Sequence, residues 1–441
     1  MLGIVEFDTK SAKRLANILN LYLFNYLTPW NGSIRSIMEQ KKKREKKEVK
    51  PNYRVGNKKE LLILLHKLGV IPFRSLRLLT APARPRILQQ AIYQMERDHV
   101  VKIEKRGNEK IVMLQNTELQ RKKYQEYIPA LLIDYYNDFS SRNLWRTSEK
   151  DIVGQIKVIR DTDAQMFFHA CRFQIGPDAK DISKELIEMK ERSYYSSREL
   201  KRLDGYNDGK TSTGKKISAS RVNGMMLTDS GAYAVYNLGN QMIEWRRFSE
   251  VKLSTYITEL IRKRSAYEQD AKISKEAIVL ATTDKIFLQI CELNYEKNRT
   301  YRVTYMNIDY VYDSIYAVPE DVNGKLLIDI MSSSGWKYRI KQMLLRPEYI
   351  EDQKFTTVPC DGYDQVNDVY ILIFCIPDLV KLKSYIARAN LEGNKKKYRV
   401  YCYSYQIPLL VTLAGTNVEI LKTDIQKFHD KYFSEKMIDS G

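Results

Sequence analysis

The feature that most constrains the fold is a run from residue 58 to residue 115, in which three helical patterns precede two strand patterns. The first pattern, KKELLILLHKL, repeats leucine at helical spacing, and Gly69 is placed to end that helix. Pro72 is expected to open a second, short helix with Leu76 and Leu79 turned inward. This order predicts a small helical module that is followed by a β-hairpin.

The third helical pattern and the hairpin complete this module. RILQQAIYQMERD (86–98) places apolar residues at positions i, i+3, i+4 and i+7 of one helix face, and glutamine, arginine and tyrosine on the other. The segments HVVKIEK (99–105) and EKIVMLQ (109–115) read as strands joined by a Gly/Asn turn. Three short helices and a basic hairpin are typical of a winged helix-turn-helix, which we assign to residues 51–125.

A winged helix of this kind predicts binding to double-stranded DNA. Its third helix enters the major groove, where Arg and Gln can hydrogen-bond to base edges, while basic residues of the hairpin reach phosphates. Such modules also dock proteins, and this alternative remains open. The residues expected to contact DNA are Arg84, Arg86, Gln89, Gln90, Tyr93, Gln94, Arg97, Lys102, Lys105, Arg106 and Lys110.

The distribution of charge favours DNA over a protein partner. Residues 1–125 contain 27 Lys and Arg against 11 Asp and Glu, a net charge of +16. The other 316 residues contain 46 against 43, so they are nearly neutral. Since excess positive charge attracts polyanions, the N-terminal part is predicted to be a nucleic-acid-binding head.

Other classes of protein are disfavoured by the composition. The five cysteines show no C-x-x-C spacing, so neither a disulfide framework nor a zinc site is expected. No apolar run approaches the roughly 18 residues that span a bilayer. We therefore expect a cytoplasmic, DNA-associated protein without membrane, metal or cofactor. Residues 1–50 are predicted to form an amphipathic helix and a basic linker, which could also track DNA.

The rest of the chain predicts two α/β domains, at residues 126–270 and 271–441, and hence an α+β multidomain protein. In the second of these, continuous apolar strands that alternate with helices predict a parallel sheet covered on both faces. Asp361, Asp368, Asp378 and Gln406 stand at strand ends and are interpreted as structural caps. The predicted helices cover 149–173, 194–203, from Glu250 to 264, and 378–391; the predicted strands cover 222–228, 232–237, 277–284, 369–379, 398–406 and 417–424.

Two stretches of the sequence resemble a known family. VGNKKELLILLHKLGVIPFRSLRLL and SRVNGMMLTDSGAYAVYNLG are similar to the replication-relaxation proteins of Gram-positive plasmids and integrative conjugative elements, over about residues 55–265. That family pairs an N-terminal winged helix with a domain that resembles the PD-(D/E)xK nuclease fold. The resemblance implies a bacterial mobile-element protein that acts in replication or transfer, at an origin or as a relaxosome accessory. A relaxase or a replication protein would then be its partner, and homo-oligomerisation is left open.

The nuclease-like region departs from a working nuclease. Such an enzyme needs an acid on one strand and (Asp/Glu)-x-Lys on the next, to bind Mg²⁺ and activate water. Asn223 stands where the resemblance places the first acid, and Tyr236 and Asn237 stand near the second. The E-x-K at residues 250–252 opens a predicted helix rather than ending a strand. Asp229 stands at the tip of the predicted hairpin, where Asp is common because it favours turns. The weak catalytic candidates are therefore Glu250, Lys252 and Asp229, and we expect an inactive relative of the nucleases.

The sequence is compatible with three functions. The first is sequence-specific DNA binding without chemistry, in the replication or transfer of a mobile element. The second is transcriptional regulation, with a C-terminal domain that senses a ligand or forms oligomers. The third is a metal-dependent nuclease delivered to DNA by its winged helix.

Overall fold

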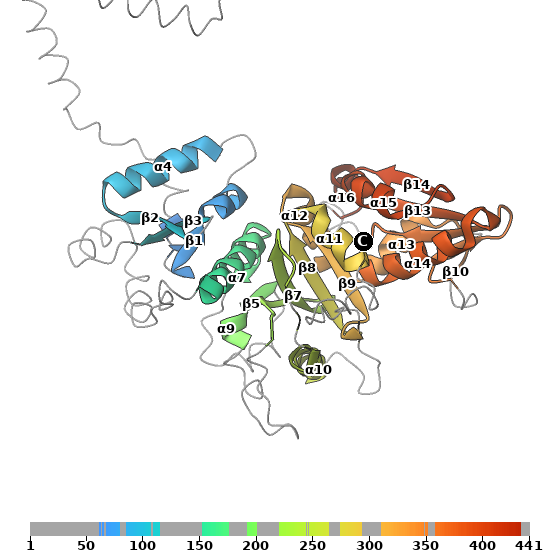
Figure 1. The fold of residues 1–441 in the computed structure, drawn as a ribbon, viewed down its shortest axis with the longest axis horizontal. Coiled ribbons are helices and arrows are strands. Elements are labelled where there is room, and N and C mark those ends of the chain that lie inside the picture. The colour runs from blue at the N-terminus through green and yellow to red at the C-terminus, as the bar shows by residue number, and fades with distance from the viewer. Residues whose placement is uncertain are drawn as a thin grey trace, which may run out of the picture. The chain divides into compact units, whose positions relative to one another are not determined.

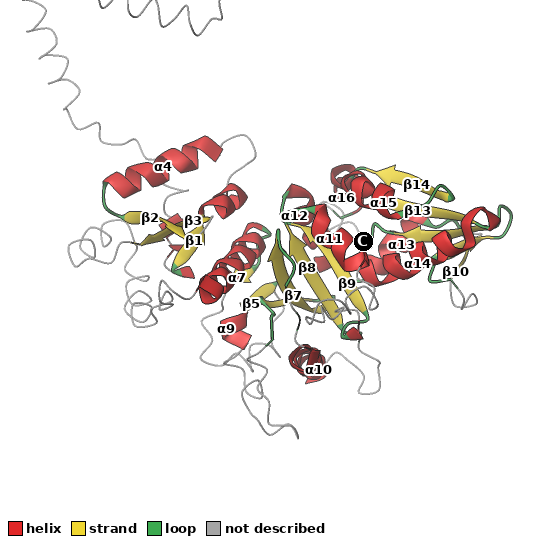
Figure 2. Ribbon diagram, viewed as in Figure 1, coloured by secondary structure: helices red, strands yellow, loops and turns green. Residues whose placement is uncertain are grey.

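Three β-sheets organise the part of the chain that the structure describes, and the fold is α+β (Figure 1 and Figure 2). The structure is a computed structural model. Within the described residues, no helix is long and apolar enough to cross a bilayer. The described residues all fall within one compact unit, Asn57–Gly441. They are 61–62, 64–65, 68–79, 85–106, 109–114, 152–175, 192–200, 220–243, 245, 247–263, 274–292, 310–347, 349–351 and 358–433.

The first sheet has three short antiparallel strands in the order β1-β3-β2. The described positions between 61 and 68 are helical, and Gly69, with a φ of 77°, donates its N–H to the Leu65 carbonyl (2.8 Å), which ends this helix as predicted. Pro72 was expected to open the second helix, and this prediction is wrong. Pro72 instead ends a strand, where its missing N–H is tolerated. The elements are β1 (Val70–Pro72), the 3-10 helix η1 (Phe73–Leu79), α4 (Pro85–Arg97), β2 (Val101–Arg106) and β3 (Glu109–Leu114).

The second sheet is mixed and has six strands in the order β4-β5-β6-β7-β8-β9. β5, β6 and β7 pair antiparallel, and β7, β8 and β9 pair parallel. The helix predicted over 194–203 begins only at Ser197, because residues 193–196 pair with β6. The elements are α7 (Ile152–Ala170), β4 (Gln174–Ile175), β5 (Ser193–Ser196), α9 (Ser197–Leu200), β6 (Gly224–Thr228), β7 (Gly231–Gly239), α10 (Arg247–Lys263), β8 (Glu276–Ala281), α11 (Asp284–Glu292) and β9 (Ser314–Pro319).

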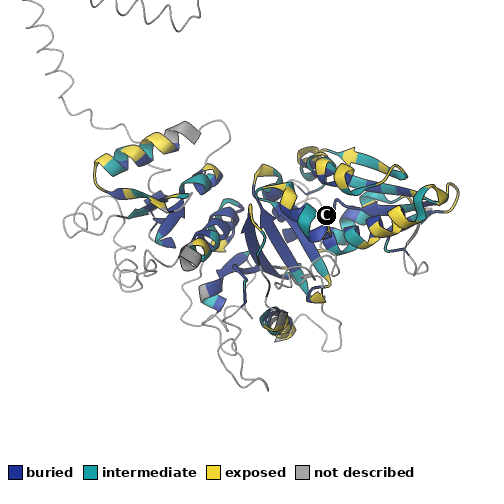
Figure 3. Ribbon diagram, in the orientation of Figure 1, coloured by how far each residue is buried: buried dark blue, intermediate teal, exposed yellow. Residues whose placement is uncertain are grey.

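Both faces of this six-stranded sheet are buried (Figure 3). Along β7, Tyr233 and Val235 pack in one apolar cluster with α7 and with a helix that follows β9, α12 (Val322–Ser332). Ala234 and Tyr236 point the other way, into a cluster with α10 and α11. Since successive strand residues alternate between faces, helices on both sides account for the nearly unbroken apolar character of β7 and β8.

The third sheet has five strands in the order β10-β11-β12-β13-β14, and β12, β13 and β14 pair parallel. This confirms the parallel arrangement predicted from the three apolar segments in the last quarter of the sequence, but the sheet as a whole is mixed, because β10 and β11, and β11 and β12, pair antiparallel. The elements are α13 (Trp336–Leu344), β10 (Ile350–Glu351), β11 (Gly362–Asp364), β12 (Val369–Ile373), α14 (Leu379–Glu392), η6 (Gly393–Lys395), β13 (Lys397–Tyr403), η7 (Ser404–Gln406), α15 (Ile407–Leu413), β14 (Val418–Thr423) and α16 (Ile425–Tyr432).

The polar residues at the strand ends of this sheet have structural partners. Asp378 caps α14 by accepting from two of its backbone N–H groups, and Gln406 accepts from the Tyr403 N–H at 2.8 Å. Asp361 is buried, accepts from Lys381 at 2.7 Å and also bonds a backbone N–H. Asp368 pairs with a lysine side chain, Lys396.

The predicted domain boundary at 270/271 does not fall between two sheets. β7 precedes it and β8 follows it, yet the two strands pair in parallel over residues 234–239 and 277–281. The sequence pattern locates β7 and β8, but only long-range pairing decides which sheet a strand joins.

Candidate nucleic-acid interface

Helix α4 buries one face and exposes the other. Pro85 occupies its first position, where a missing N–H is harmless. Leu88, Ile92 and Met95 are buried in the core of the first sheet, as their helical spacing predicts. Gln89, Gln90, Tyr93 and Arg97 are exposed, whereas Gln94 is half-buried. The solvent-facing side of α4 therefore carries amide, aromatic and guanidinium groups, which are the groups that read base edges.

The β2–β3 hairpin adds basic side chains to the same module. Its pairing register sets Lys105 directly opposite Lys110, and both lysines are exposed. Like charges in directly opposed positions destabilise a hairpin unless a counter-charge lies nearby, so this pair favours an anionic ligand. Lys102 is also exposed, but it forms an ion pair with Glu104. Because that ion pair partly neutralises its charge, Lys102 is a weaker candidate for a phosphate contact.

The two faces of the hairpin have different surroundings. Strand alternation puts Lys105 and Lys110 on the face of Ile103 and Val112, which packs in the cluster that also contains the buried residues of α4. Ile111, on the opposite face, packs against Ile159 of α7. The lysine pair thus extends the side that meets α4, and the other side is covered by α7.

Three predicted DNA contacts lie partly or wholly outside the described residues. Arg84 is not among the described residues. Arg86 belongs to α4 and Arg106 ends β2, but their side chains are not described. The structure thus places Gln89, Gln90, Tyr93, Arg97 and the hairpin lysines on one module, and leaves these three arginines as predictions.

The weak catalytic candidates are not brought together. Glu250 is buried in the first turn of α10, while Asp229 is exposed at the β6–β7 turn. Glu250 accepts a hydrogen bond from Tyr236 of β7. Tyr236 lies five residues along β7 from Gly231, so its backbone is roughly 16 Å from the turn that holds Asp229. Lys252, two residues further along α10, is half-buried.

Glu250 already has its hydrogen-bond partners. Ser220 Oγ and the Arg221 N–H each donate at 2.7 Å, and Tyr236 Oη donates at 2.6 Å. Burial raises the pKa of Glu250, and these hydrogen bonds oppose that rise. An acid held in this way stabilises the packing of α10 on β7 and is poorly suited to bind Mg²⁺.

An acid on α7 that sequence reasoning passed over occupies the position next to Asn223. The Asn223 amide donates to Asp161 Oδ1 at 2.6 Å, and Ser197 Oγ donates to Asp161 Oδ2 at 2.8 Å. The side-chain oxygen Oδ1 of Asn223 accepts from the backbone N–H of Asn237 at 2.6 Å. Asp161 and Asp163 interrupt the apolar pattern of the predicted helix 149–173. This interruption is the feature of the sequence that could have indicated buried polar contacts there. Across the described part of the chain, no three His, Cys, Asp or Glu side chains are arranged to hold a metal ion.

Comparisons of the chain with protein-family models, with characterised proteins and with solved structures find no match. The resemblance of residues 55–265 to the replication-relaxation proteins therefore stays a prediction. The function proposed for the chain rests on the geometry of α4 and of the β2–β3 hairpin.

Proposed function

We propose that residues 61–114 belong to a winged helix-turn-helix that binds double-stranded DNA in a sequence-specific manner. The observation that carries the proposal is the element order helix, β1, η1, α4, β2, β3, with β1 and β2 both paired to β3. In this order α4 corresponds to the recognition helix and the β2–β3 hairpin to the wing. The exposed polar face of α4 and the opposed lysines support DNA as the ligand.

The two elements would have separate tasks on DNA. Gln89 and Gln90 carry amides that pair with adenine edges, and Arg97 carries a guanidinium that pairs with guanine. Lys105 and Lys110 would bind phosphates, which fixes the module on the duplex without reading its sequence. Tyr93, which is 42% exposed, offers an aromatic edge beside the two glutamines.

The wider role proposed is that of a mobile-element protein in replication or transfer, with a relaxase or a replication protein as partner. This part rests on the family resemblance and on a net charge of +16 that is confined to residues 1–125. The nearly neutral remainder suits a body that positions the DNA-binding module rather than a second DNA grip. A regulator with a sensing C-terminal domain is the alternative. A nuclease is disfavoured by the hydrogen bonds that hold Glu250.

A gel-shift experiment tests the proposal. The purified full chain is mixed with fragments of the DNA element that encodes it, at two salt concentrations, with and without Mg²⁺. Retention of one fragment without cleavage is expected for an origin or operator binder. Equal, salt-sensitive retention of every fragment would contradict sequence-specific binding, and cleavage that needs Mg²⁺ would support the nuclease.

A further inference from the structure

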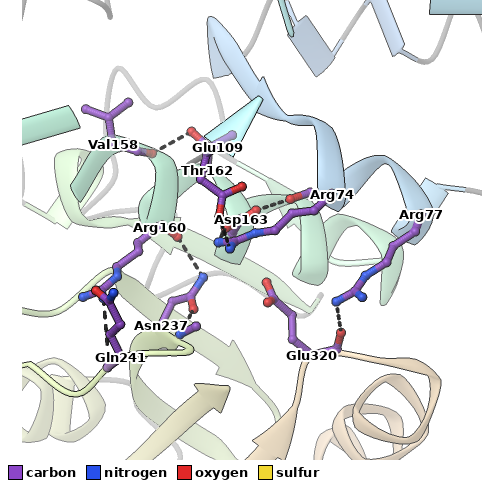
Figure 4. A network of polar contacts seen from close by, with 12 residues as sticks. Arg74, Arg77, Glu109, Val158, Arg160, Thr162, Asp163, Asn237, Gln241 and Glu320 are labelled. Carbon is purple, nitrogen blue, oxygen red and sulfur yellow. Dashed lines mark hydrogen bonds and ion pairs between the residues drawn. The ribbon is translucent and has the colours of Figure 1, made fainter. Parts of the chain in front are cut away.

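Four hydrogen bonds connect the η1 segment to α7, to α12 and to the end of β9, and Figure 4 shows those of Arg74 and Arg77. Arg74 Nη2 donates to the carboxylate of Asp163 on α7. Arg77 Nη2 donates to the backbone carbonyl of Glu320, directly after β9, at 3.1 Å. Lys325 Nζ, on α12, donates to the carbonyl of Leu78 at 2.8 Å. We call this contact region the η1 joint.

Arg74 is the central cation of the η1 joint. Its Nη1 donates to Glu109 Oε1, at the start of β3, at 2.6 Å, while its Nη2 bonds Asp163. Asp163 is fully buried and also accepts from Ser75 Oγ. The same guanidinium thus links the hairpin strand β3 to α7.

Glu320 is the unusual group of the η1 joint. Its side chain is 3% exposed, and neither of its carboxyl oxygens has a hydrogen-bond partner among the described residues. A buried carboxylate without a donor is disfavoured in its charged form, because it loses hydration and gains no hydrogen bond in return. The charged groups that act on it are Asp163 from α7, Arg74 and Arg77 from η1, and Glu109 from β3.

The charges around Glu320 favour its neutral form. Burial and, to a smaller extent, the negative charge of Asp163 raise the pKa of Glu320 to about 8, against the opposing effect of Arg74 and Arg77. Arg74 is already committed to Asp163 and Glu109. At neutral pH the closed η1 joint therefore holds one proton more than an open joint with a hydrated Glu320 would hold.

We propose that Glu320 is a proton-controlled latch of the η1 joint. Neutral Glu320 lets η1 stay packed on α7 and on the end of β9, whereas ionised Glu320 drives η1 away from them. The reason is geometric: Arg77 of η1 holds the Glu320 backbone carbonyl, and the buried carboxyl group lies within the influence of Arg74 and Arg77 of η1, so that withdrawal of η1 would admit water to it. This proposal concerns the docking of η1 and holds whether or not the module binds DNA.

Linkage fixes the sign and the range of the effect. Because Glu320 binds its proton more tightly in the closed joint than in an open one, the closed joint loses stability as pH rises from the ordinary pKa of 4.5 to about 8. One proton changes the ratio of open to closed joint by up to about tenfold per pH unit within that range. Above about pH 8 the ratio is expected to level off, because Glu320 is then ionised in both states.

Hydrogen exchange measured by mass spectrometry tests the latch in the full chain. Protection factors, corrected for the intrinsic pH dependence of exchange, are followed for η1 from pH 6 to pH 9, with β13 as an internal reference. We expect the protection of η1 to fall by up to about tenfold per unit between pH 6 and 8 and then to level off, while β13 stays constant. Protection of η1 that does not change with pH in the unmodified protein would overturn the proposal.

Three variants sharpen this test. Glu320→Gln keeps the shape but cannot ionise, so its η1 protection should be independent of pH. Asp163→Asn frees Arg74 to neutralise Glu320, so the fall in protection should shrink. Asp321→Asn is the matched control, because it removes the neighbouring exposed carboxylate and asparagine still caps α12; it should keep the full pH dependence. Equal slopes in Glu320→Gln and in the control would contradict a role for Glu320.

Discussion

Glu250 and Asp161 are buried acids that the sequence presents very differently. Glu250 is a catalytic candidate in the sequence because it begins an E-x-K motif. In the structure it accepts three hydrogen bonds and helps to pack α10 on β7. Asp161 sits in a helix whose apolar spacing dominates the pattern, and yet it anchors Asn223 and Ser197. Residue identity indicates which chemistry is available, but burial and hydrogen-bond partners arise from contacts between distant segments.

The exposed face of α4 predicts base discrimination at the residue scale. Gln90→Ala and Arg97→Ala should each weaken binding to the cognate fragment by about 1–3 kcal/mol, since each removes a base-edge hydrogen bond. Binding to unrelated DNA should change much less for Gln90→Ala. Competition gel shifts measure both affinities, with Gln342→Ala on α13 as an exposed control. Parental selectivity in both α4 variants would count against a recognition helix.

Gly324, in the first turn of α12, lies so close to the end of β9 that no larger residue is expected to fit there. A Cβ built at this position would lie 1.8 Å from the carbonyl oxygen of Pro319, which is backbone and has little freedom to move. Gly324→Ala should therefore lower the free energy of unfolding by about 1–3 kcal/mol or more, as overpacking does. Urea denaturation checks this against Gly415→Ala, whose Cβ would meet only asparagine side chains at 3.0 Å. Equal losses in the two variants would contradict the close approach.

At the scale of elements, the sequence predicts most helices and strands but not how they combine. α4, the β2–β3 hairpin, the β6–β7 hairpin and the parallel strands β12–β14 lie close to their predicted ranges. The periodicity of apolar residues is a local signal, which explains this success. Sheet order is not local, so the pairing of β7 with β8 and the contacts of η1 with α7 could not be read from the sequence.

The C-terminal helix α16 is tied to α12 through one histidine. His429 Nε2 lies 2.6 Å from Asp329 Oδ2, and Arg192 pairs with the same carboxylate. The hydrogen bond to Asp329 raises the pKa of His429 above its ordinary 6.5, while burial opposes the rise. Protonated His429 thus stabilises the folded chain fully below about pH 6.5, and this contribution is lost as pH rises through the folded pKa.

His429→Gln should remove this contribution, on the order of 1 kcal/mol at pH 6. The difference in unfolding free energy between the parent and the variant is expected to shrink as pH rises above 6.5. Chemical denaturation between pH 5.5 and 8.5 measures the difference, with His169→Gln on α7 as a histidine control. A difference that grows with pH would refute the assigned role of His429.

At the scale of the whole molecule, the distribution of charge and the packing of the α4 module both favour binding of a polyanion to that module. Residues 1–125 carry +16 of the net charge of +19, and the module that contains α4 packs on α7 through β1, β3 and η1. The outer face of α4 and the lysine pair of the hairpin are thereby left exposed, where a polyanion can reach them. The sequence foresees this module from its pattern and charge, but not the η1 joint that attaches it to the six-stranded sheet.

The salt dependence of DNA binding by a hairpin variant tests the central claim most directly. Lys105→Gln combined with Lys110→Gln should reduce the slope of log affinity against log salt by about 1.8, because each lost phosphate contact removes about 0.9. Lys395→Gln combined with Lys397→Gln, which changes two exposed lysines around the start of β13, should keep the parental slope. The predicted result is a shallower slope in the hairpin variant alone. Identical slopes in the parent and both variants would contradict DNA binding through this module.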